Sequence, residues 1–227
     1  MRNLARRVLR YDVVLVSFVT VLLLSNITAT KLIAIPVGSA TLIVDGGAVL
    51  FPLSYILGDI LAEVYGFARA SRAIIMGFVV SVLAALVFLI VQIAPPAPEY
   101  AHQEAFAEVL GFVPRIVAAS LVGYLAGQFL NAYVLTALKR RWPSHLFTRL
   151  LGSTIVGEGV DTVCFCLIAF GGVISAGAMV NYVVVGFLYK VGIEALLLPV
   201  TARVIAAFHR HGDAPRRDAV LDGVVEV

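Results

Sequence analysis

Six long apolar runs dominate the pattern of hydrophobic and polar positions along the chain. About 20 apolar residues in a helix cross a hydrocarbon core of about 30 Å, and each run reaches that length. The fold class predicted is an all-α integral membrane protein with six transmembrane helices. They are expected over residues 11–33, 47–66, 72–93, 113–138, 149–170 and 181–206.

Polar and turn-forming residues separate these runs. After the first run, Pro36, Gly38 and Gly46 break the helical pattern, and TLIV (residues 41–44) is a candidate short strand or re-entrant piece. Residues 94–112 are rich in proline and acidic side chains, and we expect a short amphipathic helix there. These segments predict compact connections rather than a soluble domain.

Composition agrees with a membrane protein. The 227 residues are 61% hydrophobic and only 14% charged, with a mean hydropathy of +0.99, whereas soluble domains are about 25% charged. The net charge of +3 does not indicate nucleic-acid binding, because an excess of Lys and Arg in a membrane protein first sets its orientation. The two cysteines, Cys164 and Cys166, are two residues apart on one predicted helix, so they cannot form a disulfide with each other.

Basic residues alternate between the two sides of the predicted helices. Four lie in residues 1–10, two between the second and third helices, four between the fourth and fifth, and four around the C-terminal end, which makes 14 of the 17. By the positive-inside rule both termini are cytoplasmic. The predicted organisation is a basic cytoplasmic arm (1–10), a transmembrane domain (11–206) and a charged, disordered cytoplasmic tail (207–227).

Two acids occupy equivalent places in the two halves of the chain. Asp59 and Asp161 each lie about twelve residues into the second and fifth helices, which run in opposite directions. This spacing favours a 3+3 inverted repeat of the kind found in many transporters. Coincidence between two polar helices is the alternative.

Ionisable residues inside the predicted spans are the candidate chemistry. Counting from Arg149 at about 1.5 Å per residue, Glu158 lies about 13 Å and Asp161 about 18 Å along the helix, near the middle of the bilayer. A carboxylate at that depth costs about 2.5–3.5 kcal/mol on insertion scales and rarely faces lipid. Further ionisable residues lie at Asp59, Glu63, Lys190 and Glu194. Since acids outnumber bases, a proton relay, an ion site or a substrate site is expected.

Lys190 lies level with Asp161, about 13–15 Å into its own helix. A Lys190–Asp161 pair is therefore expected. Such a pair is either purely structural or part of a cavity lining.

Enzyme and channel functions are disfavoured. All four histidines (His102, His145, His209 and His211) lie outside the predicted spans, so neither an intramembrane metal site nor a Ser–His pair is available. No Walker-type phosphate loop is present. The polar residues are mixed in kind and spread over several helices, which favours a transporter or a substrate-binding membrane component over a channel.

Amides and aromatic rings accompany the acids. Gln128 and Asn131 lie inside the fourth helix, Tyr55 lies near Asp59 in the second, and Phe165 follows Asp161 in the fifth. A stacking wall with carboxylate acceptors suits a flat ring bearing several N–H donors, such as a guanine-like base.

Four segments resemble the queuosine precursor transporter family, also called the vitamin uptake transporter family and formerly a domain of unknown function. They are FPLSYILGDILAEVYG, RIVAASLVGYLAGQFLNAYVLTALK, GSTIVGEGVDTVCFCLIAF and YKVGIEALLLPV, and the resemblance covers roughly residues 12–206. Residues that match the family pattern are Asp59, Gly66, Arg115, Ser120, Gln128, Ser153, Asp161, Thr162, Lys190 and Pro199. Glu158 and Asn131 fall at positions that vary among relatives.

The resemblance implies a bacterial inner-membrane protein that imports 7-cyano-7-deazaguanine or its aminomethyl relative for the synthesis of queuosine in tRNA. In this hypothesis the carboxylates are ligand acceptors or proton carriers, the amides orient the ring, and Lys190 holds the carbonyl or neutralises Asp161. Arg115 gates the outer end or pairs with an acid. The expected substrate-binding residues are Tyr55, Asp59, Glu63, Gln128, Asn131, Glu158, Asp161, Phe165 and Lys190. No cofactor, metal or nucleic-acid partner is expected, and homodimerisation is left open.

Two alternatives stay open from the sequence. One is a substrate-binding subunit that requires a separate ATP-driven motor, as in energy-coupling vitamin transporters, or an importer of another small heterocycle. The other is a structural or assembly factor whose buried charges only pair with one another.

Overall fold

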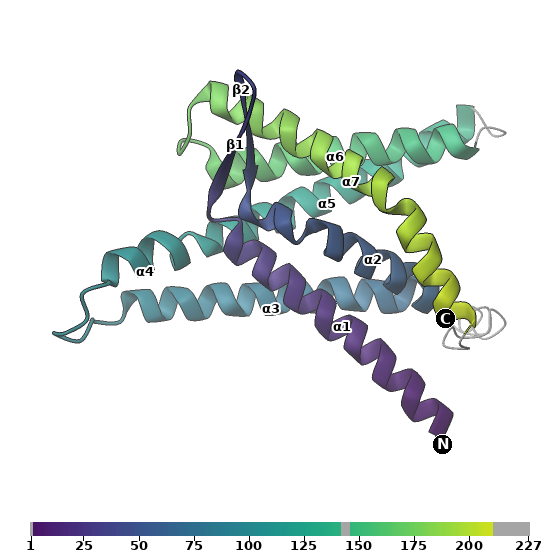
Figure 1. Cartoon of the computed structure of the whole chain (residues 1–227), viewed down its shortest axis with the longest axis horizontal. Helices are drawn as coiled ribbons and strands as arrows, with labels where there is room; N and C mark the ends of the chain where they lie inside the picture. The colour runs from purple at the N-terminus through teal and green to yellow at the C-terminus, as the bar shows by residue number, and fades with distance from the viewer. Residues whose placement is uncertain (1, 142–145, 211–227) are drawn as a thin grey trace. The chain divides into compact units, whose positions relative to one another are not determined.

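The computed structural model describes residues 2–141 and 146–210 and is mostly helical (Figure 1). The elements in chain order are α1 (Arg2–Thr28), β1 (Leu32–Val37), β2 (Ala40–Asp45), the 3-10 helix η1 (Gly46–Val49), α2 (Phe51–Tyr65), α3 (Phe67–Ile93), α4 (Gln103–Leu110), α5 (Val113–Arg141), α6 (Leu146–Phe170) and α7 (Ala176–Arg210). The chain divides into two compact units. The first takes Met1–Ser25, Val49–Ser81 and Ile193–Val227, and the second takes Asn26–Ala48 and Val82–Gly192.

Five stretches of the described chain are long and apolar enough to cross a membrane. They are Tyr11–Thr28, Phe67–Ile93, Gln103–Asn131, Gly152–Phe170 and Ala176–Leu197. The multi-pass membrane protein is thus confirmed, but the second of the six predicted helices is shorter than expected. α2 has 15 residues, which reach only about 22 Å at 1.5 Å per residue. The residues before it, predicted as helix from 47, form the 3-10 turn η1 instead.

Residues 32–45 form a β-hairpin, so the strand expected at TLIV is present (Figure 1). The first helix ends at Thr28 rather than at residue 33, because Leu32 and Ile33 pair with Asp45 and Val44 in the antiparallel ladder. Gly38 takes φ +60° in the two-residue turn, a conformation that glycine adopts without a steric penalty.

Other element ends also differ from the sequence pattern. The short helix expected in the acidic loop is α4. The basic turn predicted after the second helix is a single residue, Gly66, whose φ of +81° ends α2, and α3 starts at Phe67. The described part of the N-terminal arm continues as the start of α1, and α7 runs to Arg210. The rest of the predicted C-terminal tail, from residue 211, lies outside the described residues.

The first unit is held by apolar contacts among α1, α2 and α3. Its buried cluster is Val14, Val21, Leu57, Ile60, Leu61, Val64, Tyr65, Ala70 and Ala73. Near this cluster the Tyr11 hydroxyl donates to the Arg69 carbonyl at 3.2 Å, and the Tyr11 and Tyr65 rings lie edge to face. These contacts fix neighbouring turns of the three helices to one another.

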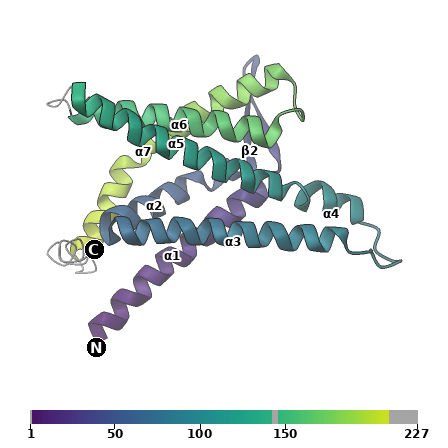
Figure 2. The same cartoon turned by 180° about the vertical axis from the view of Figure 1, so that it is seen from behind.

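In the second unit, α5 and α6 lie side by side along their length (Figures 1 and 2). Their approach depends on glycines, because a Cβ on Gly127 would lie 2.8 Å from the Gly157 carbonyl oxygen and 2.9 Å from the Asp161 Cβ. A Cβ on Gly123 would lie 2.7 Å from Asp161 Oδ1. Gly123 and Gly127 form the small-xxx-small spacing that lets membrane helices pack closely.

This packing predicts that Gly127→Ala destabilises the protein by about 1–3 kcal/mol, because the new methyl group meets backbone that cannot yield. Thermal unfolding of the purified protein in detergent measures the effect. Gly192→Ala is the matched control, since nothing lies within 4 Å of its added Cβ and the change should be neutral or slightly stabilising. Equal effects of the two changes would contradict the close α5–α6 contact.

Candidate functional site

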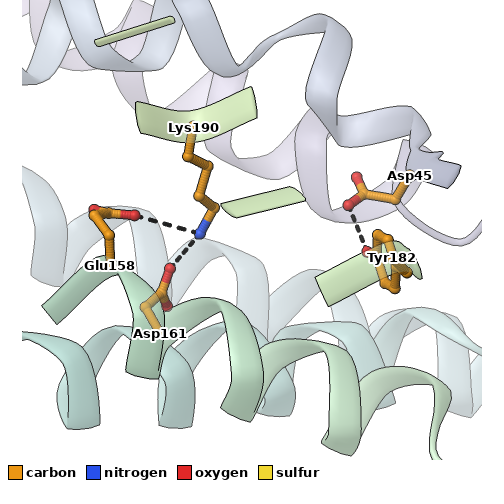
Figure 3. A network of polar contacts seen from close by, with 5 residues as sticks. All are labelled: Asp45, Glu158, Asp161, Tyr182 and Lys190. Atoms are coloured by element: carbon orange, nitrogen blue, oxygen red, sulfur yellow. Dashed lines mark hydrogen bonds and ion pairs between the residues drawn. The ribbon is translucent and has the colours of Figure 1, made fainter. Parts of the chain in front are cut away.

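An ion network joins α6 to α7 in the second unit (Figure 3). The Lys190 ammonium donates a hydrogen bond to Asp161 Oδ2 and lies 3.6 Å from Glu158 Oε2. Glu158 and Asp161 are three residues apart, so both point from one face of α6. The structure thus shows the expected Lys190–Asp161 pair and adds Glu158 to it.

The network is largely shielded. The side chains of Lys190, Glu158 and Asp161 are 19%, 23% and 22% exposed, and all three residues fall within stretches able to span a membrane. Removing one partner from such a buried set leaves an uncompensated charge, at a cost of about 3–5 kcal/mol. Two carboxylates face one ammonium, so the set can accept more donors than Lys190 supplies.

The other residues expected on α5 and α6 differ in how far they are buried: Asn131 and Phe165 pack inside the unit, and Gln128 is exposed. Asn131 packs against α6, since a Cβ on Gly157 would meet the Asn131 Cβ at 2.8 Å. Phe165 packs against a buried cluster formed by residues of α5, α6 and α7. Gln128 is exposed on α5, on the same turn as the exposed Phe129.

Two buried polar atoms near the network have no hydrogen-bond partner in the part of the chain that the structure describes. They are Asn131 Oδ1 and Thr162 Oγ1, and Thr162 is only 3% exposed. Both residues lie on the helices that carry or pack against Asp161. Each is therefore a candidate contact for a polar ligand.

The remaining expected residues, Tyr55, Asp59 and Glu63, all lie on α2 in the first unit. Asp59 is exposed, and the Tyr55 ring lies 4.6 Å from that of Phe51. The three residues of the Lys190 network, by contrast, belong to the second unit. Among the described residues, no three His, Cys, Asp or Glu side chains come together in a way that could hold a metal ion.

A second polar cluster, which the sequence pattern did not single out, lies at the end of the hairpin (Figure 3). Asp45 Oδ2 accepts from the Tyr182 hydroxyl at 2.6 Å, and Asp45 Oδ1 accepts from the Gly47 amide at 2.7 Å. Burial raises the pKa of the Asp45 carboxyl, and the bonds from Tyr182 and Gly47 oppose that rise. An acid directly before Gly-Gly was the available signal, but the partner Tyr182 is 137 residues away.

Arg115 of α5 contacts the C-terminal end of α6. Its Nε donates to the Ile168 carbonyl at 2.7 Å and a terminal nitrogen donates to the Gly171 carbonyl at 2.5 Å. The last carbonyls of a helix lack partners within the helix, and a cation there is favourable. In the described part of the chain Arg115 thus binds backbone carbonyls, and the acid partner considered from the sequence is not among its contacts.

Comparison with known proteins decides the family. Residues 45–204 match the model of the family described as "Putative vitamin uptake transporter". The chain belongs to the vitamin uptake transporter family. As a member of this family it is a transmembrane transporter and not an enzyme.

Two relatives of this transporter carry a more specific name. The present chain is 33% identical over 157 residues to the "Probable queuosine precursor transporter" of Bacillus subtilis strain 168. The aligned region covers 67% of this chain and 68% of that protein. The chain is 29% identical over 145 residues to the "Queuosine precursor transporter" of Escherichia coli K12, which covers 63% of this chain and 62% of that protein. No solved structure matches the chain.

The Arg115 contacts predict a stability effect in this transporter. Arg115→Ala removes two charged hydrogen bonds to the end of α6, and we expect a loss of about 1.5–3 kcal/mol for each. Arg115→Lys should recover part of that loss, since an ammonium can reach one of the carbonyls. Thermal unfolding measures both, with Arg72→Ala on an exposed position as control. A stability loss no larger than that of the control would argue against the capping role.

Proposed function

We propose that the protein imports a queuosine precursor, 7-cyano-7-deazaguanine or its aminomethyl relative, across the bacterial inner membrane. The observation that carries the proposal is the Lys190–Asp161–Glu158 network within membrane-spanning stretches of α6 and α7. The names of the two relatives support the same substrate class.

The chemistry of the network suits a guanine-type edge. In this proposal a carboxylate of Glu158 or Asp161 accepts from the ring N–H and the exocyclic amino group, which lie side by side as two donors. The Lys190 ammonium then donates to the ring carbonyl. A ligand bound in this way supplies donors to one carboxylate of the network and leaves Lys190 paired with the other.

Nearby second-unit residues would complete the site. Asn131 and Thr162 offer buried polar atoms without partners in the described chain, and Phe165 offers an aromatic face from α6. In the same proposal Gln128 helps to orient the ring. Tyr55, Asp59 and Glu63 of α2 remain proposed ligand or proton sites.

The proposed topology keeps both termini in the cytoplasm, supported by the 14 basic residues on one side. It requires six crossings. The η1 turn adds about 8 Å at ~2 Å per residue to the about 22 Å of α2, so Gly46–Tyr65 together reach about 30 Å. Opposed second and fifth crossings would then carry Asp59 and Asp161, as an inverted repeat requires.

Ligand-induced thermal stabilisation tests the substrate and the site together. A ligand that binds only the folded state, present at about 100 times its dissociation constant, adds about 2.7 kcal/mol of stability. We expect 7-cyano-7-deazaguanine to raise the Tm of the purified protein more than guanine does. Asp161→Asn should fold but lose this rise.

The matched control for Asp161→Asn is Glu108→Gln, the same change from acid to amide at an exposed position of α4. It should retain the full rise. No rise for well-folded wild-type protein at saturating ligand would count against the substrate. A rise that survives Asp161→Asn would count against the site.

Neutralising the pair separates a ligand site from a purely structural ion pair. Lys190→Met alone leaves two carboxylates without their cation and should reduce stability more than Lys190→Met combined with Asp161→Asn. We expect the double variant to fold but to take up no deazapurine in proteoliposomes. Uptake at the wild-type rate by the double variant would support the structural alternative.

Uptake by the purified protein alone in proteoliposomes also tests independence from a motor subunit. We expect transport without ATP or a partner. Ligand stabilisation without uptake would instead favour a substrate-binding subunit of an energy-coupling system.

A further inference from the structure

Three residues in the first half of α7 tie down the β1–β2 hairpin and the η1 turn after it. The Asn181 amide donates to the Thr41 carbonyl at 2.7 Å and accepts from the Ile43 amide at 2.9 Å. The Tyr182 hydroxyl donates to Asp45. These contacts join segments that are almost 140 residues apart in the sequence.

The third tie lies beside the ion network. The Tyr189 hydroxyl donates to the Ala48 carbonyl at 2.8 Å, and Tyr189 directly precedes Lys190. The hairpin and the turn after it therefore contact α7 from residue 181 to the turn that carries Lys190. A displacement of the hairpin would release contacts that hold this part of α7.

Asp45 is the ionisable member of these contacts. It bonds to the Tyr182 hydroxyl of α7. The Lys190 cation and Tyr189 of α7 and the Cys166 thiol of α6 interact with it electrostatically. On its own segment it accepts from the backbone amides of Gly47 and Ala48. Apart from Lys190, every group named here is neutral near pH 7, so the charge of Asp45 is only partly compensated.

We propose that Asp45 is a positioning residue of the transporter, which docks the hairpin on α7 through Tyr182, about two helical turns before Lys190, and makes that docking depend on proton concentration. The direction follows from linkage. Burial raises the pKa of Asp45 in the docked state above its ordinary value of 3.8, so docking takes up a proton at pH values between the two. Docking is therefore most stable at low pH. It weakens as the pH rises from 3.8 to the pKa that Asp45 has in the docked state.

Hydrogen exchange of the hairpin amides tests the proposal without any ligand. The Ile43 amide bonds to Asn181 only while the hairpin is docked, so protection over residues 41–47 reports docking. Exchange is followed by mass spectrometry on the full chain in nanodiscs at several pH values, after correction for the chemical exchange rate. We expect protection to fall in a step above pH 3.8 in the wild type, and Asp45→Asn to lack that step.

Two tyrosine variants separate a proton-linked contact from a merely structural one. Tyr182→Phe removes a bond that lowers the pKa of Asp45, so the step should move to higher pH. Tyr189→Phe removes a bond to Ala48 in the turn directly after the hairpin, and that bond does not involve Asp45, so protection should fall while the step stays at its wild-type pH. If Asp45→Asn does not fold, this pair of variants decides.

A wild-type step retained in Asp45→Asn, or an equal shift in both tyrosine variants, would overturn the proposal. The effect of docking on transport rests on the proposed function, and deazapurine uptake as a function of pH measures it separately. Absence of uptake by the wild type would count against the proposed function and leave the exchange result standing. A pH step in wild-type uptake that moves with Tyr182→Phe and not with Tyr189→Phe would tie the two together.

Discussion

Charge placed where a bilayer provides no water is the constraint on which the site depends. The Lys190 ammonium and the carboxylates of Asp161 and Glu158 each lose hydration in their spanning helices, and they recover part of that loss by facing one another. This requirement fixes the rotation of α6 and α7 about their axes. The α5 glycines follow from it, because α5 must approach α6 at the level of Asp161 without displacing that side chain.

Arg115 meets the same constraint in a different way. It lies in a candidate span, yet its guanidinium bonds to the carbonyls that end α6 rather than to a carboxylate. A helix end supplies a partial negative charge, which a cation can neutralise without a second ionised group. Within the second unit, Lys190 and Arg115 are therefore held by two different means, one by carboxylates and the other by backbone carbonyls.

The sequence predicted what depends on local pattern and depth. Five spans, the hairpin strand at TLIV and the Lys190–Asp161 pair followed from apolar length, turn residues and the distance of each residue from its helix end. The length of α2 did not follow, because residues 47–49 are as apolar as the helix but coil as a 3-10 turn. The role of Asp45 could not be predicted either, since it depends on a contact between residues 45 and 182 that no local pattern encodes. For the same reason the sequence could not separate Asn131, which packs against α6, from the exposed Gln128 one turn earlier.

The two edges of the hairpin have consequences for the order in which the protein forms. A two-stranded hairpin alone is marginally stable in water, and its free edge is a template for pairing with other chains. Here β1 pairs with the inner edge of β2, and the Asn181 amide bonds to the outer edge of β2, which is one of the two edges of the hairpin; Asn181 lies 138 residues further along the chain than Ile43. At about 5–20 residues per second, a ribosome needs roughly 7 to 30 s to synthesise that interval. During this time the β2 edge must remain unpaired or be protected by the insertion machinery, so α7, the last helix of the described residues, completes one of the first elements to be made.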